Sequence, residues 1–527
     1  MRPPASVAVG RGSRADRLER LRSTVFDVLV IGGGATGAAT AWAAARTGAR
    51  VALVDRRDAA GATSSASSKL VHGGLRYLRL GDVRLVREAH RERRWNASVV
   101  APHLVRPLSF VLPVRPDSPY RESELRLGVF LYGALSGFRD GRSGKMAPAE
   151  AARLAPGLRL DPGTSFVSYH DHQTDDARLV LAALRTAEDL GTTWLNYAEV
   201  LSLRTESGRV AGAEVRDAID GEAVSVRARV VVNATGPWLD TIRALEHPGA
   251  GTSVRLSKGA HLVLEPEQPW SAAVTSPLPG GRVSFAIPWH GMLLLGTTDE
   301  AFEGDPATVA ATPADEAQIL AEAATTLDAR AIRSDRVRAS FAGLRVLPLS
   351  GAGTAATKRE TVVTVGPHGM VSVAGGKLTT WRRIGVDVAT RALETVGLPV
   401  PDGRPAPVAG AADPARVADD LARSHPGLPA DVRAHLAGLY GSLAHEVLEP
   451  AAADHSLYEP IVEGAPDIRA QALYAVEREL ALTPDDILRR RTTVALRGLE
   501  AAARPAVQAF LDGAGGDLRP EAAGGSR

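Results

Sequence analysis

Cysteine is absent from the 527-residue sequence, and methionine and aromatic residues are scarce. The lack of cysteine excludes disulfides, zinc–thiolate sites, cysteine-ligated iron–sulfur clusters and thiol nucleophiles. It also excludes any cofactor attached through cysteine. Redox chemistry in this chain would therefore have to be carried by a bound organic cofactor.

A strong charge of either sign is also missing, because 62 basic residues stand against 60 acidic ones and leave a formal net charge of +2. This balance gives no field for a polyanion, so no nucleic-acid partner is predicted. Only five of the basic residues are lysine. Four of the five, Lys69, Lys258, Lys358 and Lys377, lie in segments that look like motifs. Their placement indicates fitted sites, where an ammonium and a guanidinium are not interchangeable.

No long, purely hydrophobic run is present either. The uncharged stretch at residues 28–45 is interrupted by four glycines and is not predicted to span a membrane. Residues 1–24 are rich in arginine but have no apolar core, so we expect a flexible leader rather than a signal peptide. A membrane-surface anchor is the alternative. The chain is expected in the cytoplasm, either soluble or peripheral on a membrane.

What the sequence does contain is a glycine pattern typical of dinucleotide binding. The motif GGGATG occupies residues 32–37 between a predicted strand and a predicted helix, and Asp55 follows the next strand. Gly32 would permit the tight turn, Gly34 would let the backbone approach a pyrophosphate, and Gly37 would let the helix pack on the strand. The helix N-terminus favours a diphosphate, and the carboxylate of Asp55 is placed to accept hydrogen bonds from ribose hydroxyls.

Two later segments favour FAD over NAD as the dinucleotide. Residues 230–238 (VVVNATGPW) form a predicted strand that ends in a turn, and residues 373–380 (VAGGKLTT) form a second strand–Gly-Gly–helix junction. The second helix N-terminus could stabilise negative charge on a reduced flavin ring. Both segments could instead be ordinary turns between strand and helix.

Cationic and hydroxyl side chains cluster in several short segments. Residues 63–77 (TSSASSKLVHGGLRY) contain His72, which has the chemistry of a general base but could equally be a buried histidine bonded to a backbone carbonyl. His261 and Arg345 lie in comparable segments. The triplet at residues 489–491 (RRR) is expected to form the solvated face of a helix, with docking to a quinone-containing membrane as the alternative.

Together these motifs resemble the FAD-dependent glycerol-3-phosphate dehydrogenases. GGGATG, TSSASSKLVHGGLRYL, VVNATGPW, LSKGAHLVL, FAGLRVLPL and VAGGKLTTWRR occur in the order and spacing of that family over residues 26–395. YAVERELALTPDDILRRRT resembles its C-terminal cap. Ala66 is a departure, because the family frequently has an arginine at that position.

The resemblance implies an α/β fold: a Rossmann-like FAD-binding domain, an inserted mixed β-sheet substrate domain and a C-terminal all-helical cap domain. The implied boundaries are a flexible leader at 1–24, a discontinuous FAD-binding domain at 25–80, 165–255 and 345–397, a substrate domain at 81–164 and 256–344, a linker at 398–414, a helical domain at 415–512 and a flexible tail at 513–527.

The resemblance also implies an enzyme of glycerol metabolism with non-covalent FAD. The family oxidises sn-glycerol 3-phosphate to dihydroxyacetone phosphate by hydride transfer to flavin N5, and passes the electrons to a quinone. A homodimer and a peripheral membrane contact are expected. No metal site is expected. Three alternatives stay open: a glycerol-3-phosphate oxidase that uses O₂, an amine or amino-acid oxidase on the same scaffold, and a flavin-binding protein without turnover.

The site residues implied by the resemblance fall into three groups. The predicted catalytic residues are His72, His261, Arg345 and Lys377, with either histidine as the base. The predicted substrate-binding residues are Arg76, Tyr77, Arg345, Arg359 and Lys377. The predicted cofactor-binding residues are Gly32, Gly34, Ala35, Thr36, Gly37, Asp55, Arg56, Thr63, Ser64, Ser65, Ser68, Lys69, Leu70, Val200, Ala234, Thr235, Gly236, Gly375, Gly376, Lys377, Leu378 and Thr379.

Overall fold

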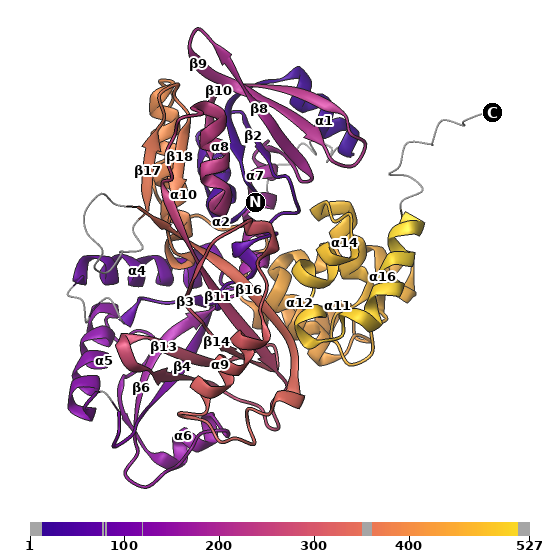
Figure 1. Cartoon of the computed structure of the whole chain (residues 1–527). Helices are drawn as coiled ribbons and strands as arrows, with labels where there is room; N and C mark the ends of the chain where they lie inside the picture. The colour runs from indigo at the N-terminus through magenta and orange to yellow at the C-terminus, as the bar shows by residue number, and fades with distance from the viewer. Residues whose placement is uncertain (1–12, 76–77, 79–81, 119, 350–360, 515–527) are drawn as a thin grey trace.

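The computed structural model describes residues 13–514 except 76–77, 79–81, 119 and 350–360. Two large β-sheets and a group of C-terminal helices make up the described chain (Figure 1). The first sheet lies in the upper part of Figure 1, the second in the lower part, and the yellow C-terminal helices lie to one side of both. This architecture confirms the predicted α/β class with a second, mixed sheet and a helical C-terminal region.

The first sheet has the order β17-β18-β10-β1-β2-β7, and β9 and β8 extend from β10. Its strands are β1 (Val25–Ile31), β2 (Val51–Val54), β7 (Thr193–Leu195), β8 (Ala198–Glu206), β9 (Arg209–Asp217), β10 (Ala223–Asn233), β17 (Val362–Val365) and β18 (Val371–Ala374). The pairs from β18 to β7 are all parallel. Parallel strands are covered on both faces, which explains why β2 and residues 28–31 of β1 are continuous apolar runs.

Helices cover one face of this sheet. They are α2 (Ala35–Ala45), α7 (Asp176–Asp189) and α10 (Trp381–Thr395), and α8 (Leu239–Glu246) follows β10. Small alanine side chains along α2 let it pack closely between α7 and α10. Trp42 of α2 stacks on Trp381 of α10 with 5.9 Å between ring centroids. The packing fixes the N-terminal ends of both helices near one edge of the sheet.

The second sheet has the order β15-β11-β14-β13-β12-β4-β6-β3, with β16 paired to β11 and β5 to β6. Its strands are β3 (Leu70–Val71), β4 (Arg106–Val114), β5 (Gly144–Met146), β6 (Ser165–Gln173), β11 (Val254–Leu264), β12 (Ala272–Pro277), β13 (Val283–Trp289), β14 (Met292–Gly296), β15 (Glu300–Phe302) and β16 (Val337–Pro348). The helices of this part are α4 (Val83–Trp95), which continues into a π-helical turn at Asn96–Val100, α5 (Glu122–Ser136), α6 (Pro148–Leu154) and α9 (Pro313–Ala323).

Two of these strands differ from the expected domain boundaries. β3 and β6 were expected in the FAD-binding domain, but both are hydrogen-bonded into the second sheet. The physical reason is the long antiparallel register between β4 and β6, which pairs nine residues from Arg106 to Val114 with β6. Boundaries implied by a resemblance of sequence motifs do not register such a pairing.

The C-terminal region is helical up to residue 514. Its helices are α11 (Pro414–Ser424), α12 (Ala430–Tyr440), α13 (Ala444–Leu448), α14 (Arg469–Glu479), α15 (Pro484–Asp486) and α16 (Glu500–Ala514), with a π-helical turn at Ile487–Arg491. Thr483 and Asp486 form a capping box at the start of α15. Residues 398–413, which precede α11, contain no helix or strand, yet Val408 is buried and its amide donates to the carbonyl of Val100 (2.8 Å).

The N-terminal segment also differs from the flexible leader expected for residues 1–24. Helix α1 (Arg14–Ser23) begins with a capping box between Ser13 and Asp16 and buries Leu18 and Leu21 against the first sheet. Arg14 pairs with the buried carboxylate of Asp217 (2.7 Å). The arginines of this segment are therefore partly ion-pair partners rather than a free basic surface. Residues 1–12 and the end of the expected tail, 515–527, lie outside the described residues.

Candidate active site

A cavity of about 860 Å³ lies at the carboxyl ends of the parallel strands of the first sheet and continues to the second sheet. Ile31, Asn233 and Ser372 pair in register across β1, β10 and β18, so these strands end at one edge. β1 has β2 on one side and β10 on the other. This is the switch point at which open α/β sheets bind their ligands.

Most of the predicted site residues line this cavity. They are Gly32, Gly34, Ala35, Thr36, Asp55, Arg56, Thr63, Ser64, Ser68, Leu70, His72, Val200, Ala234, Thr235, Gly236, His261, Arg345, Gly375, Gly376, Lys377, Leu378 and Thr379. Gly37, Ser65 and Lys69 do not line it. Arg76, Tyr77 and Arg359 lie outside the described residues.

The glycine turn after β1 is packed against backbone on two sides. A Cβ on Gly32, which has φ +110°, would lie 2.6 Å from the carbonyl oxygen of Ala234, and one on Gly37 would lie 1.8 Å from that of Gly32. Gly34 precedes the first residue of α2, whose amide donates to Ser64 Oγ (2.9 Å). The turn therefore presents backbone N–H groups and a helix N-terminus to the cavity, which suits a diphosphate.

Asp55 follows β2 beside this turn. Its carboxylate accepts hydrogen bonds from the amides of Gly33 (2.6 Å) and Arg57 (2.8 Å). Burial raises the pKa of Asp55 to about 6, although both amides act in the opposite direction. Arg56 stacks over Trp238 with its Cζ 4.3 Å from the ring centroid. These groups form the end of the cavity that suits a ribose.

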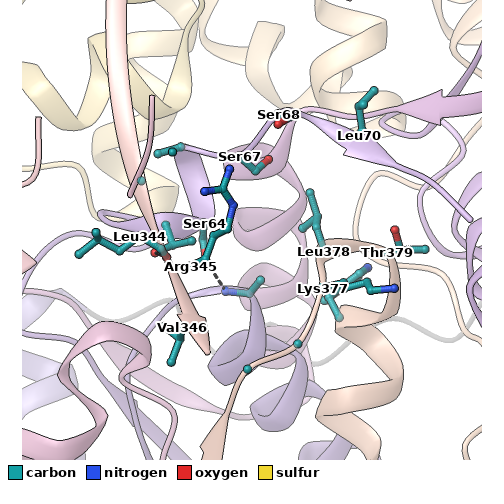
Figure 2. Close-up of a pocket in the computed structure, with 18 of the residues that line it drawn as sticks. Ser64, Ser67, Ser68, Leu70, Leu344, Arg345, Val346, Lys377, Leu378 and Thr379 are labelled. Carbon is teal, nitrogen blue, oxygen red and sulfur yellow. Dashed lines mark hydrogen bonds between the residues drawn. The ribbon is translucent and has the colours of Figure 1, made fainter. Parts of the chain in front are cut away.

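The junction after β18 meets the segment that contains His72. The hydroxyl of Thr379 accepts from the amide of His72 (3.0 Å) and donates to its carbonyl oxygen (3.0 Å). In Figure 2, Lys377, Leu378 and Thr379 lie on one side of the cavity, and Arg345 on β16 lies on the other. Thr379 thus joins two motifs that are far apart in the sequence and fixes the backbone of His72 at the cavity wall.

His261 on β11 is buried at the same cavity. Its Nε2 lies 2.8 Å from Ser68 Oγ, and its ring stacks on Phe341 with 4.9 Å between centroids. Its Nδ1 has no hydrogen-bond partner among the residues that the structure describes. Burial, together with the positive charges of Arg345 and Lys69, lowers the pKa of His261 to about 3. The imidazole is therefore neutral at neutral pH.

The guanidinium of Arg345 is held by the β11 segment and by the loop between β14 and β15. Nη1 donates to the carbonyl of Lys258 (3.1 Å) and to Asp299 (3.2 Å), and Nη2 donates to Thr297 Oγ1 (3.0 Å) and to the carbonyl of Thr298 (3.0 Å). This arrangement sets the orientation of a cation at the cavity wall.

Comparison with known proteins agrees with this geometry. A model of the family described as "FAD dependent oxidoreductase" matches residues 27–382, and one described as "C-terminal domain of alpha-glycerophosphate oxidase" matches residues 403–513. The sequence is 39% identical to the glycerol-3-phosphate dehydrogenase of Mycobacterium leprae over 511 residues, which cover 94% of this chain and 85% of that protein. The chain belongs to the FAD-dependent glycerol-3-phosphate dehydrogenase family.

Other members of the dehydrogenase family are similar over the same length. The Synechocystis glycerol-3-phosphate dehydrogenase is 33% identical, with 90% of each chain covered. The solved structure of the Bacillus halodurans glycerol-3-phosphate dehydrogenase, complexed with FAD, superposes with a TM-score of 0.78 at 29% identity and covers 96% of this chain and 93% of that chain. The L-α-glycerophosphate oxidase of Mycoplasma pneumoniae shares the fold at 14% identity (TM-score 0.51, with 72% of this chain and 98% of that chain covered).

The residues of this dehydrogenase-family chain fit FAD, its cofactor. The turn glycines leave the space that a Cβ would fill, and two helix N-termini and the carboxylate of Asp55 face one cavity. No described helix combines the length and the hydropathy that crossing a membrane requires.

Lys69 was predicted to contact the cofactor, but it does not line the cavity. Its ammonium is buried and paired with Asp176 (2.5 Å), and it lies 5.0 Å from the ring centroid of Trp289. Asp176 also accepts from the amide (3.1 Å) and hydroxyl (2.7 Å) of Ser67. Lys69 therefore holds the serine-rich segment against the start of α7. The adjacent acidic residues Asp175 and Asp176 were the signal in the sequence for this partner.

The prediction that the arginine triplet at residues 489–491 forms a solvated helix face is wrong for two of its three residues. Arg490 and Arg491 both bind the carboxylate of Asp58, and Arg491 is completely buried. Arg489 is exposed and pairs with Glu500 (2.7 Å). Asp58 itself lines the cavity and was not among the predicted site residues.

Proposed function

We propose that this chain oxidises sn-glycerol 3-phosphate to dihydroxyacetone phosphate with FAD, and that a membrane quinone receives the electrons. The observation that carries the proposal is the cavity itself, which joins the dinucleotide turn to His72, His261, Arg345 and Lys377. FAD supplies a ring that accepts the hydride at N5.

The cations at the cavity suit a phosphorylated substrate. Arg345 and Lys377 come from β16 and from the segment before α10, and they lie on opposite sides of the cavity (Figure 2). A phosphate dianion held between fixed cations would be anchored by charge-assisted hydrogen bonds. Anchoring at one end of the substrate would place its secondary alcohol at a fixed position, the main requirement for hydride transfer. Arg76 and Arg359 are proposed to complete this cation set.

The base that takes the hydroxyl proton is proposed to be His72. A pKa of about 3 makes His261 a weak proton acceptor at neutral pH. His72 lines the same cavity, and the hydroxyl of Thr379 fixes its backbone from both sides. We assign His261 a hydrogen-bonding role through Ser68, whose hydroxyl faces it at 2.8 Å.

An apolar surface on α5, beside the cavity, supports a quinone as the acceptor. Leu125, Leu127 and Leu131 of α5 line the cavity, and this helix also has large apolar side chains in solvent. Leu127 is 60% exposed, Phe130 52% and Leu131 45%. Arg121 and Arg126 are exposed on the same segment, but Glu122 and Glu124 balance their charge and Arg126 pairs with Glu122 (3.7 Å), so the apolar side chains carry this argument. In this proposal α5 contacts the cytoplasmic face of a membrane, and a lipid-soluble acceptor reaches the cavity from there.

The test starts with the purified protein and its flavin absorbance. Anaerobic sn-glycerol 3-phosphate is expected to bleach the oxidised flavin, whereas glycerol and glycine are not. Reoxidation by a quinone in lipid vesicles is expected to be faster than by O₂. Peroxide formed once per turnover would instead identify an oxidase, and bleaching by glycine alone would refute the substrate.

A matched pair of variants examines the apolar surface. Phe130→Ser is expected to slow turnover with the vesicle-bound quinone and to leave turnover with a water-soluble dye unchanged. Ile219→Ser removes an equally exposed apolar side chain (54%) from the turn between β9 and β10 and is the control. Equal effects of the two substitutions would contradict a docking role for α5.

A further inference from the structure

We propose that Arg490 and Arg491 are positioning residues for the cofactor-binding loop, so that the C-terminal helices set the affinity for FAD. The contact that carries this inference is the carboxylate of Asp58. Asp58 is 2% exposed and belongs to the loop that follows β2, whereas both arginines belong to the C-terminal region. The inference rests on the binding of FAD but on no substrate or electron acceptor.

The loop at residues 55–61 is part of the dinucleotide site. The amide of Gly33 donates to Asp55 at the start of the loop, and the amide of Ala60 donates to the carbonyl of Gly33 (3.0 Å) near its end. Asp58 stands between these two anchors and lines the cavity with Asp55. A shift of Asp58 would therefore be transmitted to both bonds that hold the glycine turn.

The arginines that hold Asp58 are themselves fixed. Arg491 donates through Nη1 and Nη2 to the two carboxylate oxygens of Asp58, and through Nη2 also to the carbonyl of Glu479 (2.7 Å). Arg490 donates through Nε to Asp58 and through Nη2 to the buried Asp486 (2.6 Å). Each arginine thus bridges the loop to a group of its own region.

The local backbone and a second contact support a rigid link. The arginines lie on the π-helical turn at Ile487–Arg491, and such turns are frequent at functional sites. Tyr197, which follows β7 in the first sheet, donates from its hydroxyl to Asp486 (2.7 Å). Burial raises the pKa of Asp58, but the two guanidinium groups outweigh it and leave the pKa below its usual value. The carboxylate therefore stays charged and bound to both arginines.

Coupling of this kind is reciprocal. If the C-terminal arginines hold the loop in its binding conformation, bound FAD must stabilise their contact by the same free energy. Couplings between protein sites typically change affinity by roughly 5- to 150-fold. The affinity for FAD should therefore fall when the contact with Asp58 is removed, even though no C-terminal residue named here has to touch FAD.

The experiment measures FAD binding to the full-length apoprotein, with recovery or quenching of flavin fluorescence as the readout. Arg491→Met is expected to raise the dissociation constant of FAD about tenfold or more. Asp58→Asn, which keeps the shape and one acceptor oxygen, is the milder second variant and is expected to act in the same direction. Should Arg491→Met fail to fold, Asp58→Asn alone decides the outcome.

Arg185→Met is the matched control. Arg185 is also buried on the first-sheet side and pairs with the C-terminal region, through Glu446 (3.2 Å) and the hydroxyl of Tyr474 (3.0 Å), but it does not contact the loop. Its loss is expected to lower the melting temperature and to leave the dissociation constant of FAD within about twofold of the parent. Equal weakening by Arg185→Met, or unchanged FAD affinity in Asp58→Asn, would overturn the inference.

Discussion

The double hydrogen bond between Thr379 and the backbone of His72 leads to a prediction about turnover. Thr379→Val replaces the hydroxyl by a methyl group of similar size and removes both bonds, each of 3.0 Å. An amide and a carbonyl of His72 would then lose their partner at the cavity wall. Each such loss costs about 1–3 kcal/mol when the group stays buried, so the two together should cost about 2–6 kcal/mol of stability.

The substitution should lower activity as well as stability. A displacement of about 1 Å in a catalytic group can lower the rate about 100-fold. We expect kcat with sn-glycerol 3-phosphate and a soluble dye to fall by a comparable factor, while the flavin stays bound. Thr379→Ser keeps the hydroxyl and is expected to restore most of the activity.

Thr380→Val is the matched control, because its hydroxyl donates only to the carbonyl of Lys377 (3.4 Å) and does not contact His72. It is expected to keep kcat within a few fold of the parent. If Thr379→Val retained full kcat with bound flavin, the positioning of His72 through Thr379 would be refuted, and with it the argument for His72 as the base.

Three further predictions concern stability. Burial is the main cause that lowers the pKa values of four histidines to about 3 or 4: His90, His103, His172 and His261. Below pH 6.5 the unfolded chain binds protons that these folded imidazoles do not, so the free energy of unfolding should fall by roughly 1.5 kcal/mol per histidine between pH 6.5 and 5. Asp55, whose pKa is raised in the folded protein, offsets part of this loss. Denaturant unfolding at pH 6.5 and at pH 5 measures the difference, and equal stability at the two pH values would contradict the low histidine pKa values. Lys69→Met leaves Asp176 buried without its cation and should destabilise the protein by about 3–5 kcal/mol in denaturant unfolding. If the variant kept its stability and lost only FAD, the result would instead support a contact between Lys69 and the cofactor. Gly37→Ala places a Cβ 1.8 Å from a backbone oxygen and should lower the melting temperature and the flavin content. Gly34→Ala is the control: its Cβ would lie 3.0 Å from the rotatable hydroxyl of Ser64, and the variant should fold.

The elements that depend on local sequence were predictable. The strand–glycine turn–helix–strand unit ending at Asp55 is a continuous pattern of apolar runs and glycines, and the structure reproduces it. The family, the α/β class and FAD are confirmed for the same reason, because each follows from motifs that are contiguous in sequence. The catalytic roles of His72, His261, Arg345 and Lys377 stay predictions.

The ion pairs were not predictable, because their partners are remote. Lys69 and Asp176 are 107 residues apart, and Asp58 and Arg491 are 433 apart. A charged side chain looks the same in the sequence whether it faces solvent or a buried partner. For this reason the sequence indicated a cofactor contact for Lys69 and a solvated surface for the arginine triplet.

The strand order of the first sheet also constrains how the protein is made. β1 and β2 leave the ribosome early, but β10, which lies beside β1, ends at residue 233, and β18 begins only at residue 371. β1 and β2 have their neighbours β10 and β7 once residue 233 has been synthesised, but β10 keeps an exposed edge until β18 follows. The interval from the end of β10 to the start of β18 is 371 − 233 = 138 residues, or roughly 7–28 s of synthesis at ~5–20 residues/s. During that interval the edge of β10 depends on protection from aggregation, and the cofactor site is complete only after the junction that follows β18 has been made.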